Sequence, residues 1–281
     1  MVPREWAGYQ NGQVVWLDVP IQQLLPYYRF IRSHPEIYTE TTSLAKTAVL
    51  YSMAAAQTDP QSYEREYRAV CKLLYDAHRQ FDVILVGDGR WNTAEPSAAQ
   101  LGRYHVILVL GPQQLRDETV DRLVDWKTGT RKLVLGGKTR SSQPGYSRLC
   151  AAALGRPVPP AELPSFVPYL ESRDADSRRD LEEAIGPDGL ISTNAPADVG
   201  IQVWQAGGRT FLHVINYGYD KDADRVRDVR SIELRLSLPT TRPRLLSPDD
   251  ERERVLPLQH EKTGVRLVLP GLHIYSVLDL N

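Results

Sequence analysis

The stretch YHVILVLGPQQLRDETVDRLVDWKTGTRKLVLGG, residues 104–137, decides the fold class. An apolar run of strand length (104–110) leads into a segment with acidic residues in its first turn and apolar residues at helical spacing. Gly129 is typical of a helix end, and a second apolar run (132–135) follows it. Strands that are apolar along their whole length, alternating with amphipathic helices, predict a parallel sheet covered on both faces.

The same alternation begins upstream. The segments TAVLYS (47–52) and DVILV (82–86) are two more apolar runs of strand length. Between them, Thr58-Asp59-Pro60 is typical of a helix start, because a capping side chain precedes a proline in the first turn. Residues 44–155 are therefore predicted to form a doubly wound α/β domain with a flavodoxin/amidotransferase-like parallel sheet, whose strand order stays open.

The period of the pattern changes towards the C-terminus. Residues 201–204 (IQVW) lead into Ala206-Gly207-Gly208, a hairpin-type turn, and residues 232–238 (IELRLSL) alternate between apolar and polar. Short alternating strands with turn residues between them predict a small antiparallel β-sandwich over residues 190–281.

Two further segments complete the expected division of the chain. Residues 1–43 form an aromatic lead-in, in which residues 24–32 predict a short helix that nearby prolines interrupt. Residues 156–189 form a Pro-rich connector between the two domains. A lead-in this aromatic is expected to pack against a partner surface.

Composition narrows the possible partners. The 281 residues include 34 Lys and Arg against 35 Asp and Glu, so the net charge of −1 gives no attraction to nucleic acid or anionic membrane. No apolar run approaches the roughly 18 residues of a membrane span, and no signal-peptide core is present, so we expect a cytoplasmic protein. Two cysteines, Cys71 and Cys150, are too few for a disulfide framework or a Cys-only zinc site.

The ends of the predicted parallel strands are where a ligand is expected, because open α/β sheets bind ligands at their carboxyl edge. This rim supplies the candidate ligand-binding residues Ser52, Asp88, Trp91, Asn92, Gly137 and Lys138. Trp91 has the ring needed to stack on a sugar or a base. The segment Gly87-Asp88-Gly89 begins like a dinucleotide fingerprint, but Asn92 stands in place of its third glycine, which favours a tight loop.

No catalytic or metal site is predicted. The turn after the fourth strand carries Gly137 and Lys138 where an amidotransferase-type nucleophile elbow has a cysteine. Cys71 lies on the apolar stripe of the first long helix and is interpreted as a small hydrophobic residue. The six histidines are scattered, and His105, His213 and His273 are expected within strands as wall or core residues.

The D-x-D-x-D run of Asp220, Asp222 and Asp224 is a further candidate for metal binding. It lacks the glycine and the distal glutamate of an EF-hand, so it predicts a solvated loop. We therefore expect no cofactor and no metal.

Several segments taken together resemble a known family. They are LPYYRFIRSHPE (25–36), YHVILVLGP (104–112), HVINYGYD (213–220) and LHIYSV (272–277). In this combination the sequence resembles the C-terminal half of barrel-type glycoside hydrolases related to the large beta-galactosidases. In that family a catalytic (β/α)8 barrel precedes an amidotransferase-like α/β domain, called the trimerisation domain, and a small β-sandwich.

The resemblance implies a role without catalysis. The family's two catalytic glutamates lie in the barrel, which needs about 250 residues, whereas only about 40 residues precede the α/β domain here. The expected function is a non-catalytic accessory or oligomerisation region of a glycoside-hydrolase-like protein. Its expected partners are further copies of itself, as a trimer or dimer, or a separate barrel domain, with carbohydrate as a candidate ligand and neither nucleic acid nor membrane.

Two alternatives remain open. One is a hydrolase or amidotransferase-like enzyme with an unrecognised site at the strand ends. The other is a small-ligand, sugar-binding module that uses the rim around Asp88, Trp91 and Gly137.

Overall fold

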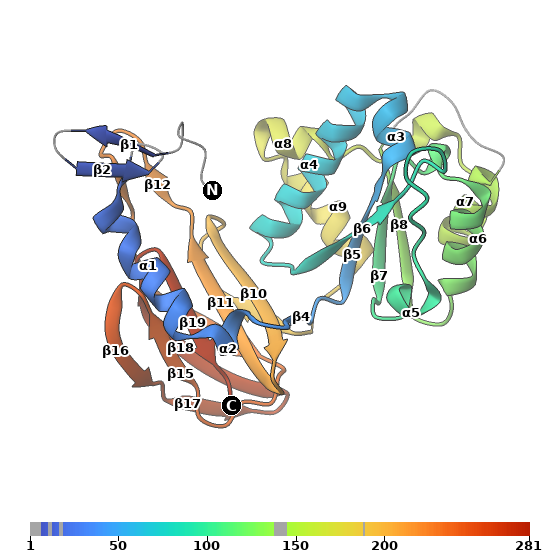
Figure 1. Ribbon diagram of the computed structural model, residues 1–281. Helices are drawn as coiled ribbons and strands as arrows, with labels where there is room; N and C mark the ends of the chain where they lie inside the picture. Colours follow the sequence, from blue (N-terminus) through green and yellow to red (C-terminus); the bar gives the residue numbers. More distant parts are fainter. Residues whose placement is uncertain (1–6, 11–12, 17–18, 138–144, 188) are drawn as a thin grey trace. The chain divides into compact units, whose positions relative to one another are not determined.

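A computed structural model describes residues 7–10, 13–16, 19–137, 145–187 and 189–281 (Figure 1). The chain divides into two compact units. The α/β unit comprises residues 45–191, and the sandwich unit comprises residues 1–44 and 192–281. No helix in these described ranges is long and apolar enough to cross a lipid bilayer.

The α/β unit is built on a parallel sheet. Its strands are β5 (Thr47–Ser52), β6 (Phe81–Val86), β7 (Val106–Leu110) and β8 (Lys132–Gly136), in the order β6-β5-β7-β8. All four predicted apolar runs form strands, and the order is that of a flavodoxin-type sheet. The predicted fold class, a doubly wound parallel sheet with a separate antiparallel β-sandwich, is confirmed.

Helices cover both faces of this sheet (Figure 1). They are α3 (Met53–Thr58), α4 (Pro60–Asp76), α5 (Ala98–Leu101), α6 (Asp117–Trp126), α7 (Tyr146–Leu154), α8 (Val167–Ser172) and α9 (Ala175–Ile185). Helices α5, α6 and α7 share one core with the strands, and α3, α4, α8 and α9 share the other. As predicted, α4 begins at Pro60, and the Asp59 side chain caps it by accepting a hydrogen bond from the Ser62 amide at 3.3 Å.

The structure differs from the expected division at the connector. Residues 156–189 belong to the α/β unit, because α8 and α9 pack beside α4 with Tyr169 and Leu181 buried. Two buried carboxylates on α4 hold this segment. Glu66 accepts hydrogen bonds from the Ser165 hydroxyl and, at 2.8 Å, from the Phe166 amide.

Asp76 is the second of these carboxylates. It accepts a hydrogen bond from the Tyr169 hydroxyl at 2.7 Å and forms ion pairs with Lys72 and Arg173. Its side chain is fully buried, and a buried carboxylate requires such partners to offset its desolvation.

The sandwich unit contains two large antiparallel sheets. The six-stranded sheet has the order β16-β15-β19-β11-β10-β4, and the four-stranded sheet has the order β17-β18-β14-β9. Their bounds are β4 (Thr42–Ser43), β9 (Ile191–Thr193), β10 (Val199–Ala206), β11 (Arg209–Asn216), β14 (Val229–Leu236), β15 (Arg244–Ser247), β16 (Asp250–Val255), β17 (Leu258–Glu261), β18 (Gly264–Leu272) and β19 (Tyr275–Asp279). The described residues also form two smaller sheets. One has the order β1 (Ala7–Gln10), β2 (Gln13–Trp16), β3 (Val19–Pro20), and the other pairs β12 (Tyr219–Asp220) with β13 (Arg225–Val226).

The alternating pattern of the sequence accounts for this unit. The predicted hairpin forms, with Gly207 and Gly208 at positive φ between β10 and β11. In β14, Ile232, Leu234 and Leu236 are buried, while the residues between them are half-buried or exposed. One face of the strand is therefore in the core and the other faces water.

The aromatic lead-in is part of the sandwich unit. Helices α1 (Ile21–Ser33) and α2 (Pro35–Tyr38) lie against the six-stranded sheet, where Phe30 and Ile37 pack with Phe211, Leu246 and Val277. The sequence predicted that prolines would interrupt this helix, but α1 continues through Pro26. Phe30 is the buried residue of this helix and packs into the core of the sandwich unit.

Candidate functional site

The rim of the parallel sheet was the predicted ligand site, and its residues are engaged within the chain. Ser52 is buried, and its hydroxyl caps α3 by accepting a hydrogen bond from the Ala55 amide at 3.2 Å. The Ser52 amide in turn donates to the Tyr63 hydroxyl at 2.6 Å. Ser52 therefore secures the turn from β5 into α3.

Asp88 organises the loop that follows β6. Its Oδ1 accepts hydrogen bonds from the amides of Arg90, Trp91 and Asn92 at 2.8–2.9 Å, and its Oδ2 accepts one from Gln57 at 2.8 Å. These bonds, with that from Asn92 first, hold the pKa of Asp88 well below its ordinary value. The carboxylate therefore holds the loop after β6 together and links it to Gln57 on α3.

The remaining rim candidates lie in differing environments. Trp91 is 79% exposed, with the Arg90 guanidinium 5.5 Å from its ring centroid. The Asn92 side chain accepts a hydrogen bond from the Ala94 amide at 2.8 Å. Gly137 has a φ of 81°, and its amide donates to the Pro164 carbonyl at 2.9 Å. Lys138 lies outside the described residues.

The cysteines have no nucleophilic setting. Burial raises the pKa of the Cys71 thiol to about 11, so it stays protonated at neutral pH. Cys150 lies on α7 and is fully buried in the core. Among the described residues, no group of three or more His, Cys, Asp or Glu side chains could hold a metal ion.

Two of the histidines lie outside the strands in which they were expected, whereas the acidic run forms a turn, in agreement with the predicted loop. Of the three histidines expected within strands, only His213 lies in one, whereas His105 precedes β7 and His273 precedes β19 in exposed positions. Asp220 accepts hydrogen bonds from the amides of Asp222 and Ala223 at 3.1 Å, which is the geometry of a self-capped turn.

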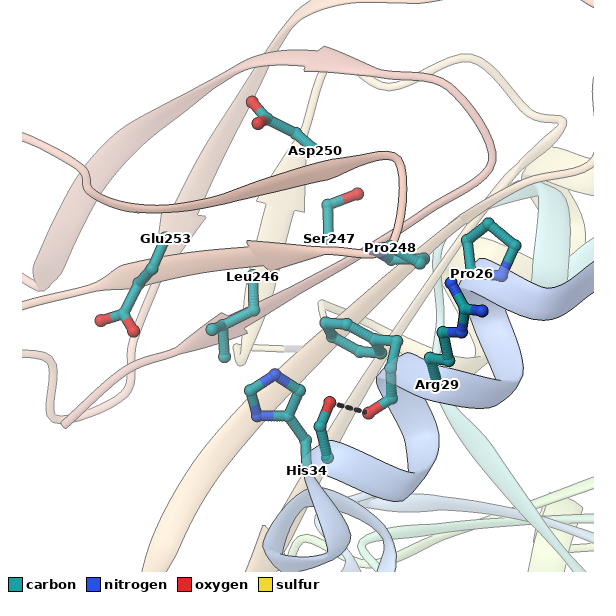
Figure 2. Close-up of a pocket in the computed structure, with 10 residues that line it drawn as sticks. Pro26, Arg29, His34, Leu246, Ser247, Pro248, Asp250 and Glu253 are labelled. Carbon is teal, nitrogen blue, oxygen red and sulfur yellow. Dashed lines mark hydrogen bonds between the residues drawn. The ribbon is translucent and has the colours of Figure 1, made fainter.

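A polar cavity of about 340 Å³ opens between α1 and strands β15 and β16 of the sandwich unit (Figure 2). Phe30 and Leu246 form its apolar part. Its polar lining comes from the side chains of Arg29, Ser33, His34, Ser247, Asp250 and Glu253, with Pro26 and Pro248 beside them.

The two carboxylates of this cavity are paired with arginines. Asp250 forms an ion pair with Arg254, and Glu253 forms one with Arg244 at 2.9 Å. Both carboxylates are therefore already engaged by partners within the chain.

Comparisons with known proteins show which structures share this fold. No protein-family model and no curated protein sequence matches the chain. Among solved structures, it is similar to the alpha-L-fucosidase isoenzyme 2 from Paenibacillus thiaminolyticus, with a TM-score of 0.61 and 12% identity over 90% of this chain. The fold is one that occurs in glycoside hydrolases.

A second structure shares this fold. The beta-galactosidase from Bacillus circulans sp. alkalophilus matches 93% of this chain with a TM-score of 0.51 and 12% identity. The match covers 51% of the fucosidase chain and 45% of the beta-galactosidase chain, so this chain spans about half the length of each.

Sequence reasoning missed a second cavity, which lies on the six-stranded sheet around His213. Its residues come from β10, β11, β19 and the helical lead-in, which are far apart in the chain. The available signal was polar and aromatic: Gln202, Trp204 and His213 occupy one face of a predicted hairpin.

Proposed function

We propose that this chain is a non-catalytic accessory and assembly region of a glycoside-hydrolase-like protein. The observation that carries the proposal is the joint match of both units to one fucosidase chain, at a TM-score of 0.61 over 90% of this chain. The α/β unit then corresponds to the trimerisation-type domain of the family that the sequence resembles, and the sandwich unit to its accessory β-domain. In this proposal the catalytic barrel is supplied by another part of the assembly.

The edge strand β6 supports the assembly role. It lies at one end of the parallel sheet, and Val83 and Leu85, which share one face of the strand, are 50% and 45% exposed. An open strand edge with exposed aliphatic side chains favours pairing with another chain. We assign this edge as the contact with a second copy of the chain.

The edge strand β16 of the sandwich unit provides an internal contrast. Its sequence is DERERV, and its described charges include ion pairs such as Arg254 with Asp250. Charged edges discourage pairing. Val255, which is 50% exposed on this strand, is therefore a matched position that should not take part in assembly.

Mass in solution tests the assembly role. We expect the chain to form a dimer or trimer, and the double variant Val83→Lys/Leu85→Lys to shift it to monomer, because two buried charges would oppose the contact. Val255→Lys should leave the mass unchanged. An unchanged mass for the double variant, or dissociation by Val255→Lys, would place the contact elsewhere.

An activity assay tests the proposal that the chain is non-catalytic. The chain alone should not hydrolyse aryl glycosides above the uncatalysed rate. Turnover that co-purifies with the chain and responds to substitutions in it would overturn the non-catalytic role and favour a hydrolase.

A further inference from the structure

The second cavity, of about 320 Å³, lies on the outer face of the six-stranded sheet beside α1 and α2. We call it the aromatic cavity. Its lining contains the rings of Tyr38, Trp204, His213 and Tyr275 and the aliphatic chains of Ile31, Ile37 and Ile215, with Thr41 and Gln202 as the other polar members. A mostly apolar cavity with a few polar groups is typical of a small-molecule site.

A chain of hydrogen bonds fixes the His213 ring. Its Nδ1 lies 2.7 Å from the Tyr275 hydroxyl, which lies 2.9 Å from the Tyr38 hydroxyl. The Tyr38 ring packs edge-on against the imidazole, with centroids 5.9 Å apart. Burial lowers the pKa of His213 to about 4, so the ring is neutral at physiological pH and carries a single N–H.

The other ring nitrogen, Nε2, is buried and has no hydrogen-bond partner among the described residues. Whether it is a donor or an acceptor depends on which way the tyrosine hydroxyls point. A ligand hydroxyl satisfies either tautomer, because a hydroxyl both donates and accepts. A ligand hydroxyl would supply the hydrogen bond that this buried nitrogen lacks.

The lining also defines the charge and shape of the ligand. None of its residues is Asp, Glu, Lys or Arg, which favours a neutral ligand. The Trp204 and Tyr275 rings provide apolar faces, and Trp204 Nε1 donates a hydrogen bond to Gln202 Oε1 at 3.4 Å. A neutral ring with one apolar face and several hydroxyls meets all these conditions.

We propose that the aromatic cavity binds a neutral sugar ring, with one hydroxyl hydrogen-bonded to His213 Nε2 and the apolar face of the ring against Trp204. One rearrangement is required, because Nε2 is covered in this structure. Gln202 faces His213 across the β10–β11 pair and is exposed, and its movement would break the hydrogen bond that its Oε1 accepts from Trp204 Nε1. The site is independent of the assembly role, and the two can fail separately.

Titration of the full chain with methyl glycosides tests the proposal. Calorimetry with the methyl glycosides of galactose, glucose and fucose should detect binding of at least one, and Trp204→Ala should weaken it by about ten-fold or more through loss of the stacking face. Trp91→Ala, which removes the exposed tryptophan of the α/β rim, should leave the affinity unchanged. Cyclohexanol, an apolar ring with one hydroxyl, should bind more weakly than the sugar.

A second measurement does not depend on whether a variant folds. In the wild-type chain, the imidazole nitrogen resonances of His213 should move on addition of the sugar, whereas those of the exposed His260 should not. Three results would each overturn the proposal: no binding of any of these glycosides, loss of binding in Trp91→Ala but not in Trp204→Ala, or unchanged His213 resonances at saturation.

Discussion

The α/β rim and the aromatic cavity hold their polar side chains in opposite ways. At the rim, half-buried Asp88 accepts four hydrogen bonds from its own loop and Gln57. In the aromatic cavity, His213 is mostly buried, yet its Nε2 has no partner among the described residues. The rim thus holds a polar group whose hydrogen bonds are met within the chain, whereas the aromatic cavity contains a buried polar atom without one.

The largest expected effect concerns the buried carboxylates of the α/β unit, where polar groups are paired. Asp76→Ala removes the acceptor for Tyr169 and the partner of Arg173 and Lys72, so the free energy of unfolding should fall by about 3 kcal/mol. Urea denaturation of the full chain measures this. Asp180→Ala, at an exposed position on α9, should change the value by less than about 0.5 kcal/mol. Equal effects would contradict the stated role of Asp76.

The next effect tests the buried imidazole. Because the pKa of His213 is about 4 in the folded chain and about 6.5 when unfolded, only the unfolded chain binds this proton between those values. Stability should therefore fall by up to about 3 kcal/mol as the pH drops from 6.5 to 4. The facing hydroxyls of Tyr38 and Tyr275, whose pKa values burial raises, stay protonated throughout.

Replacement variants isolate this contribution. The difference in stability between wild type and His213→Phe should depend on pH over this range. His260→Phe, at an exposed position in the same unit, should keep the wild-type slope. An identical slope in His213→Phe would mean that the buried imidazole does not govern the acid response.

The smallest effect is local to the rim. Asp88→Ala should speed amide hydrogen exchange at Arg90, Trp91 and Asn92, whose N–H groups lose their acceptor. Asp88→Asn keeps an Oδ1 acceptor and should preserve most of the protection. If Asp88→Ala altered sugar affinity without altering this exchange, the rim would be a ligand site and the comparison would fail.

The sequence predicts those parts of the fold in which apolar residues follow a regular pattern. The four parallel strands and the start of α4 at Asp59 and Pro60 were evident because buried strands and capped helices have local signatures. The placement of α8 and α9 was missed, because Glu66 and Asp76 secure them with polar groups on a buried stripe. A pattern of apolar and polar residues predicts that carboxylates such as these face solvent.

The sites were harder to predict for a different reason. The topology of the sheet predicts the rim candidates. The hydrogen bonds that Asp88 accepts from backbone amides depend instead on the geometry of its loop, which the topology does not give. The aromatic cavity brings His213 to Tyr275, 62 residues away, and Tyr275 to Tyr38, 237 residues away. Such contacts arise only when the lead-in folds against the sheet.

We propose a role in association rather than in catalysis, and sedimentation equilibrium of the wild-type chain over micromolar concentrations tests this most directly. We expect a mass of two or three times 31.7 kDa. A mass of 31.7 kDa at every concentration would rule out the proposed assembly.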